Sequence, residues 1–371
     1  MLHLVFILFY LQFLSPKITP FTKFNTNIAM VTAAVNIGQG HVQLEELGAI
    51  TNMPVLSNSK YQLLHNDIST YMNELSWEDV ELAGKEETKN AIENNDVGPE
   101  GRPMIAVVAD GAWSKRSYKT KYNALSGIAC IVGAKTRKIL FIGVRNNYCC
   151  VCQRAYKNNK EPKEHMCFKN WLFPSTVMEA DIIVDGFKRS LDMHNLIYLR
   201  LIGDGDSSVM NKLHCAKPYG RDFLIKKFEF LNHILRNYVN KLKDIALLQK
   251  EEQIEAQTIK DRILRLRYAI TEAVKYWRNK KDISFEEELL NLKKDLMNGH
   301  SHEQRMDKLV AAKSHILFHA ESLLYKINNN AAESYNSIFS KFIGGKRVNF
   351  SMRELKGMVK NVTQYNILIY T

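Results

Sequence analysis

A long span without proline or glycine most constrains how this chain can fold. Pro218 is the last proline, and no glycine occurs between Gly220 and Gly299. Because these two residue types most often interrupt helices, we expect a helical region, which we place at residues 221–325. Its first part has apolar residues at the spacing of three and four that is typical of one helix face, namely Leu224, Phe228, Leu231, Leu235, Tyr238 and Leu242.

The part of the chain before this span has the pattern of β-strands. Three short apolar runs are separated by charged turns, which favours an antiparallel meander: MIAVVAD, NALSGIACIVGA and KILFIGVRN. An amphipathic helix is expected near residues 176–194, and YLRLIGDGDSSV contains a fourth strand. The predicted fold is therefore α/β, with a mixed sheet in residues 101–220.

Residues 21–100 are expected to form a helical region followed by a linker. The polar stretch Trp77–Asn95 leads into the turn-rich sequence NNDVGPEGRP, so we interpret it as the linker. Residues 1–20 begin with the apolar run MLHLVFILFYLQFL, which is shorter than the roughly 20 residues that span a bilayer. No lysine or arginine precedes this run, so we interpret it as a stretch without function rather than a signal peptide, and expect no membrane partner.

Acidic residues end two of the predicted strands. Asp110 follows an apolar run in VVADGAWSK, and Asp204, with Asp206 nearby, follows another in LIGDGDSSV. The adjoining glycines let the backbone turn sharply and leave the carboxylates at the sheet edge. Side by side, such groups would suit Mg²⁺ or Mn²⁺, which prefer oxygen ligands. A turn or cap is the alternative role for each acid taken singly.

Glu333 is the candidate for a third acid. It lies in NNNAAESYNSIFSKFIGGKR, where we expect the first turns of a helix within a C-terminal catalytic region, residues 326–371. Asn336 and Ser337 would share its helix face. Three converging acids can hold two metal ions for phosphodiester chemistry. The alternative role for a single acid near a helix N-terminus is a favourable interaction with the helix dipole.

A Cys/His segment, residues 148–171, has the spacing of a metal site. Two residues separate Cys149 from Cys152, twelve separate Cys152 from His165, and one separates His165 from Cys167. Thiolate and imidazole ligands in this number suit a tetrahedral, structural Zn²⁺ site. Cys150 is a spare thiol or an alternative ligand, and a buried apolar cysteine is the other interpretation. Six cysteines in 371 residues are too few for a disulfide scaffold.

The chain is basic, with a net charge of +12 and a sequence pI near 9.2. Such a charge favours a polyanionic partner, with DNA ahead of a membrane surface. Basic residues follow the first and third acids, and we expect them to contact DNA phosphates: Lys115, Arg116, Lys119, Lys346 and Arg347. The alternative role of these residues is to keep the protein soluble.

Several strings together resemble the Mutator-like DDE transposase domain: ADGAWSKRSY, MEADIIVDGFKRS, RLIGDGDSSV, NHILRNY and NNNAAESYNSIFSKFIGGKRVNF. The resemblance implies a ribonuclease H-like core with a helical insertion before the third acid. It also implies metal-dependent cleavage and joining of DNA strands at transposon ends, in the nucleus, by a chain that can form homo-oligomers. Asp110, Asp204 and Glu333 match the three acids. The four Cys/His ligands match the family's zinc-binding insertion.

The chain departs from the family at one motif. Where the family has Cys-x2-His, this sequence has Phe230 and His233. His233 remains a candidate for contacting DNA or ordering the active site, and a packed core histidine is its plainer interpretation. The loss of the cysteine favours an alternative function, that of an inactive, transposase-derived DNA-binding protein. A secreted disulfide protein is a third, weaker hypothesis, suggested by the apolar N-terminus alone.

Overall fold

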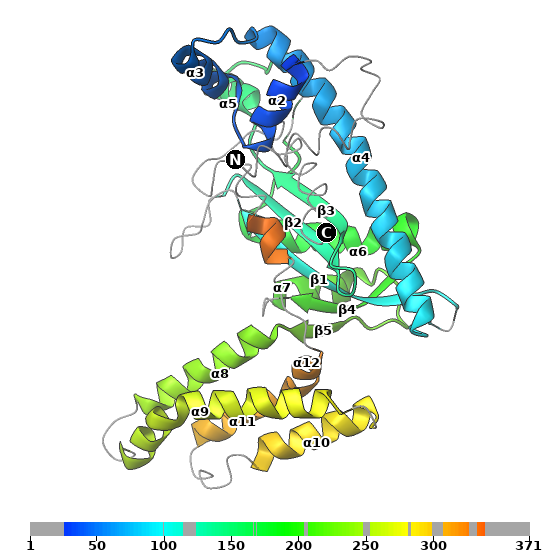
Figure 1. The fold of residues 1–371 in the computed structure, drawn as a ribbon, viewed down its shortest axis with the longest axis vertical. Helices are drawn as coiled ribbons and strands as arrows, with labels where there is room; N and C mark the ends of the chain where they lie inside the picture. Colours follow the sequence, from blue (N-terminus) through cyan, green and yellow to red (C-terminus); the bar gives the residue numbers. More distant parts are fainter. Residues whose placement is uncertain are drawn as a thin grey trace.

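A mixed sheet of five strands lies at the centre of the part of the chain that the structure describes (Figure 1). The structure is a computed structural model, and it describes residues 26–98, 100–113, 124–165, 167, 169–203, 207–247, 253–280, 283–298, 307–325 and 332–337. The prediction of an α/β fold around a mixed sheet is confirmed. The strand order is β3-β2-β1-β4-β5, with bounds Met104–Trp113 for β1, Ser126–Gly133 for β2, Ile139–Asn146 for β3, Ile197–Gly203 for β4 and Lys226–Glu229 for β5.

The first three strands form the antiparallel meander that the sequence predicts. β1 pairs with β2, and β2 with β3, in antiparallel orientation. On its other side β1 pairs in parallel with β4, which in turn pairs in parallel with β5. Only β2 therefore runs against the other strands of this sheet.

β1 extends beyond Asp110, so the prediction that this strand ends on the carboxylate is wrong. The residues from Gly111 to Trp113 continue the pairing with β2. Glycine permits close packing here, because a Cβ atom on Gly111 would lie 2.7 Å from the carboxyl carbon of Glu179. Asp110 is consequently held inside a strand, where the pleat fixes the face to which its side chain points.

The N-terminal helices are α2 (Thr26–Asn36), α3 (His41–Thr51) and α4 (Asn58–Glu93). α4 takes in almost the whole of Trp77–Asn95, which corrects the prediction of a linker in that stretch. The polar residues form the outer face of a helix that packs beside the sheet (Figure 1). Its inner face carries buried residues at helical spacing, namely the apolar Val80, Ala83 and Ala91 and the acidic Glu87.

One face of the sheet is covered by α6 (Met178–His194) and α7 (Ser207–Ala216). α6 confirms the helix predicted near residues 176–194. Gly186 lets α6 approach closely, because a Cβ atom there would come within 2.5 Å of side-chain atoms of Ile131 and Phe141. On the other face, residues of the sheet such as Phe228 of β5 pack with Val80, Phe230, Ala332 and Tyr335.

The span after Gly220 is mainly helical in the described residues, as predicted. It contains α8 (Leu231–Ala246), α9 (Gln253–Arg278) and α10 (Phe285–Asn298), followed by α11 (Asp307–Phe318) and α12 (Ala320–Leu324). These helices share a hydrophobic core of their own. None of the described helices is long and apolar enough to cross a membrane.

The start of that span differs from the prediction. The periodic apolar residues were expected to share one helix from Leu224 to Leu242, but Phe228 lies in strand β5 and α8 begins at Leu231. Leu224 is 68% exposed in the loop before β5. A four-residue strand is too short for its period of two to be separated from a helix turn by spacing alone.

Candidate active site and metal centre

Asp110 lies in the central strand, on the sheet face that it shares with Val108 and Ala112. Its side chain is half-buried, and its Oδ1 atom accepts a hydrogen bond of 2.9 Å from the N–H of Gly111. Its Oδ2 atom accepts a hydrogen bond of 2.8 Å from Nδ2 of Asn336, a residue 226 positions later in the chain. The carboxylate is therefore oriented from two sides.

Asn336 belongs to the helical segment 332–337, which also carries Glu333 (orange in Figure 1). Ala332 and Tyr335 anchor this segment by packing into the apolar cluster on the Asp110 face of the sheet. The Tyr335 hydroxyl also donates a hydrogen bond of 3.3 Å to the carbonyl oxygen of Arg137. The structure thus brings the segment of the predicted third acid to the strand of the first acid, with Glu333 one helical turn before Asn336 and exposed.

Asp204 and Asp206 lie outside the described residues, but β4 leads directly to them. β4 runs parallel to β1, with Ile202 opposite Val108. A Cβ atom on Gly203, the last residue of β4, would lie 3.6 Å from the carbonyl oxygen of Ala109. The chain therefore leaves β4 beside the residue that precedes Asp110.

Glu179 is an acid near this site that the sequence analysis did not single out. It lies in the first turn of α6, half-buried beneath Gly111. Gly111 and Asp110 face opposite sides of the sheet, so Glu179 and the Asp110 carboxylate are on different faces. Burial raises the pKa of the Cys130 thiol, and the charges of Asp110 and Glu179 raise it further. The only sequence signal for Glu179 is an acid in the first turn of a helix, which is common at helix N-termini.

The predicted Cys/His ligands come together. Cys149 precedes α5 (Cys150–Lys157), Cys152 lies in its first turn, and His165 and Cys167 come from the following loop. The Nε2 atom of His165 lies 3.2 Å from Sγ of Cys149 and 3.4 Å from Sγ of Cys152, and the sulfurs of Cys152 and Cys167 are 3.6 Å apart. A tetrahedral zinc site has N···S edges of about 3.6 Å and S···S edges of about 3.8 Å. The donor set therefore fits zinc in both type and spacing.

Hydrogen bonding prepares these ligands for a metal. The Nδ1–H of His165 donates to the carbonyl oxygen of Lys163 at 2.7 Å, which leaves Nε2 facing the sulfurs. Partial burial raises the pKa of Cys149, but hydrogen bonds from the Cys152 backbone and from His165 outweigh it and bring the pKa to about 6. The hydrogen bond with Cys167 raises the pKa of Cys152 to about 11. Thiol groups crowded in this way favour a bound cation, which removes the repulsion between neighbouring thiolates.

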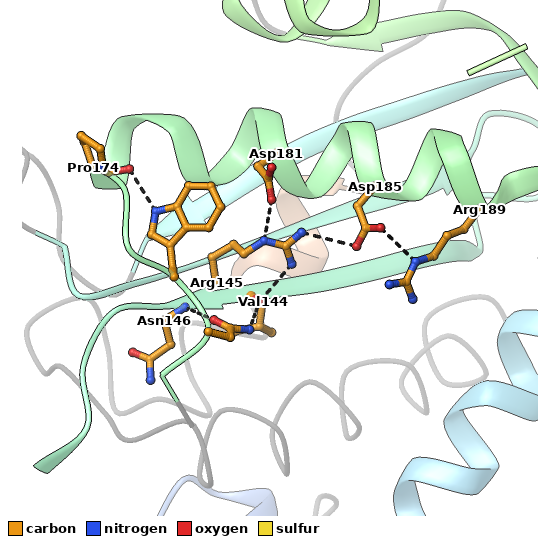
Figure 2. Close-up of polar contacts among 9 residues, drawn as sticks. Val144, Arg145, Asn146, Pro174, Asp181, Asp185 and Arg189 are labelled. Atoms are coloured by element: carbon orange, nitrogen blue, oxygen red, sulfur yellow. Dashed lines mark hydrogen bonds and ion pairs between the residues drawn. The ribbon is translucent and has the colours of Figure 1, made fainter. Parts of the chain in front are cut away.

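Side-chain contacts link the end of the Cys/His segment to β3, and β3 to α6 (Figure 2). Arg145 of β3 makes ion pairs with Asp181 at 2.6 Å and with Asp185 at 3.4 Å, both on α6. The guanidinium of Arg145 also lies 5.8 Å from the ring centre of Trp171, whose indole N–H donates to the carbonyl oxygen of Pro174. This network positions the chain between the Cys/His group and α6.

A family model for Mutator-like transposases matches residues 20–305. The chain belongs to the Mutator-like transposase family. A search of curated proteins found no match. The match includes Asp110, Asp204 and the Cys/His ligands, whereas the segment of Glu333 follows the matched residues.

The Phe230 position, where the Mutator-like pattern has cysteine, is part of the core. Phe230 is 2% exposed and packs in the apolar cluster that contains Tyr335. His233 lies in the first turn of α8, half-buried, with its ring edge-on to Phe230 at a centroid distance of 6.0 Å. The predicted DNA contacts fall outside the described residues, namely Lys115, Arg116, Lys119, Lys346 and Arg347.

Proposed function

We propose that this chain cuts and joins DNA strands at transposon ends by metal-dependent phosphoryl transfer. The observation that carries the proposal is the hydrogen bond between Asn336 and Asp110, because it brings the segment of Glu333 to the central strand. Family membership makes transposition the general function. The geometry supports the finer statement that Asp110, Asp204 and Glu333 form one carboxylate site.

A ribonuclease H-like core is part of this proposal. The strand order β3-β2-β1-β4-β5, with β2 alone reversed, supports it. In such a sheet the first and second acids belong to adjacent parallel strands, and Asp110 and the end of β4 have this relation. A helical region between β5 and segment 332–337 accords with the expected insertion before the third acid.

Asp110, Asp204 and Glu333 would hold Mg²⁺ or Mn²⁺. When bound, these ions lower the pKa of an attacking water or DNA 3′-hydroxyl and offset charge on the scissile phosphate. Asn336 holds the Asp110 carboxylate in one orientation, which preorganises the ligand. The buried anchor Tyr335 keeps Asn336 and Glu333 in place.

DNA would approach along the basic segments that follow the first and third acids. Because the net charge is +12, we propose that phosphate contacts dominate its affinity. We further propose that the protein acts as a homo-oligomer on chromosomal DNA in the nucleus. We assign Zn²⁺ to Cys149, Cys152, His165 and Cys167 as a structural ion, on the donor set and spacing given above.

A second candidate function is an inactive DNA-binding protein derived from a transposase. The burial of Phe230 at the position of the family cysteine favours it, because no thiol is available there for catalysis. The two candidates share the fold and the zinc group. They differ in whether the carboxylates support turnover.

Glu333→Gln is expected to slow Mg²⁺-dependent DNA cleavage about tenfold or more, because the amide keeps the shape of the side chain but lacks its charge. The experiment compares the full chain and this variant on DNA carrying the transposon ends, with Mg²⁺ and with a chelator. Glu286→Gln, an exposed acid in α10, is the matched control and is expected to retain wild-type activity. Equal traces of cleavage in all samples, including those with chelator, would favour the inactive candidate.

A further inference from the structure

Three side chains of types that can bind metal ions lie close together where the sheet joins the helical region. Glu229 is the last residue of β5, His315 lies in the last turn of α11, and His319 is the residue between α11 and α12. One ligand atom from each of these three residues lies within 4.8 Å of the others. α12, which begins directly after His319, sits below β5 in Figure 1.

The polar atoms of this group are buried without matching partners. Oε2 of Glu229 and Nδ1 of His315 are inaccessible to solvent and have no hydrogen-bond partner among the described residues. Nε2 of His319 lies 3.8 Å from Oε2 of Glu229, which is too long for a hydrogen bond. The side chains of His319 and Glu229 are only 13% and 15% exposed. Such unpaired donors and acceptors are unfavourable unless a further group binds them.

A plain ion pair does not account for the arrangement. Burial lowers the pKa of His315 and of His319, and the positive charge of Lys241 lowers both further, against the opposing effect of Glu229. Burial therefore favours the neutral form of both imidazoles. Neutral imidazole is the form that ligates transition metals.

We propose that Glu229, His315 and His319 bind a transition-metal ion, with Zn²⁺ as the best fit. The N–H of His319 donates a helical hydrogen bond of 3.2 Å to the carbonyl oxygen of His315, so the two imidazoles lie on the same side of the chain. The Glu229 carboxylate supplies the third ligand. A set of two imidazoles and one carboxylate suits Zn²⁺ better than Mg²⁺ or Ca²⁺, which prefer oxygen ligands only.

This site is separate from the two described above. The Cys/His group follows β3, and Glu229 ends β5, which are the opposite edge strands of the sheet. The ion would link β5 to α11 and add to the hydrogen bond of 3.4 Å that the Glu229 N–H donates to the Ser322 hydroxyl in α12. Its effect would be to fix the helical region to the sheet.

Zinc stoichiometry of the full chain tests the proposal. In excess Mg²⁺, which occupies oxygen-only sites, wild type is expected to bind two equivalents of Zn²⁺ tightly. The double variant Cys149→Ser/Cys152→Ser is expected to retain one equivalent. Adding His319→Gln to that variant is expected to weaken the remaining equivalent by on the order of a hundredfold. His214→Gln, an exposed histidine of α7, is the matched control and is expected to leave both equivalents in place. An unchanged second equivalent in the His319→Gln background would overturn the proposal.

Cobalt spectroscopy of wild type decides the question without relying on the folding of a variant. The first equivalent of Co²⁺ in the Cys/His group gives thiolate charge-transfer absorption. A second equivalent with ligand-field bands but no added thiolate absorption would support the site at Glu229. Binding of a single equivalent, with thiolate absorption only, would refute it.

Discussion

Asp110→Asn is expected to slow Mg²⁺-dependent DNA strand cleavage about a thousandfold, which corresponds to about 4 kcal/mol of transition-state stabilisation. The effect should exceed that of Glu333→Gln, because Asp110 is held in the central strand by two hydrogen bonds, whereas Glu333 is exposed on segment 332–337. The asparagine keeps the size of the side chain, so the strand and its pairing with β2 should persist. Single-turnover cleavage of labelled transposon-end DNA gives the rate.

The control for this variant is Asp67→Asn, because Asp67 is an exposed acid on α4. It should cleave DNA at the wild-type rate. Circular dichroism of both variants checks that the fold is retained. If Asp110→Asn cleaves within threefold of wild type while folded, Asp110 is not a metal ligand.

Phe230→Ala is expected to lower the free energy of unfolding by about 3 to 5 kcal/mol. The reason is that Phe230 is 2% exposed and packs in a cluster with Phe228 and Tyr335. Removing the ring leaves a cavity beside the segment that carries Glu333. Urea unfolding followed by circular dichroism measures the change.

Leu224→Ala is the matched control, because Leu224 is a large apolar residue six positions earlier that is 68% exposed. Its effect should stay within about 0.5 kcal/mol. A loss of less than 1 kcal/mol in Phe230→Ala would contradict the packing described here. Such a result would also remove the structural reason for a phenylalanine at the family's cysteine position.

The sequence predicts the strands well because their signal is local. The runs around Val107, Ile131 and Phe141 are apolar, short and bounded by charged turns, and all three form buried strands. The linker prediction for Trp77–Asn95 fails because composition is a weaker signal than spacing. The small buried residues Ala83 and Ala91 carry the helical period, and small residues hardly change the mean hydropathy of a polar stretch.

The candidate sites also differ in how well the sequence predicts them. The Cys/His group is predictable because its four ligands fall within nineteen positions and have a spacing typical of zinc sites. The contact between Asn336 and Asp110 depends on how the helical region returns the chain to the sheet, so no local pattern indicates it. The same is true of Glu229 with His315 and His319, since a lone carboxylate at a strand end carries no metal signature.

Iron-directed backbone cleavage tests the central claim, that Asp110, Asp204 and Glu333 bind divalent metal together. With added hydrogen peroxide and ascorbate, Fe²⁺ that replaces Mg²⁺ reduces the peroxide to hydroxyl radicals, which cut the polypeptide close to the bound ion. Cuts are expected near residues 110, 204 and 333; excess Mg²⁺ should suppress them, and Asp110→Asn should abolish all three together. Cuts at only one of these positions, or cuts at all three that persist in Asp110→Asn, would contradict this claim.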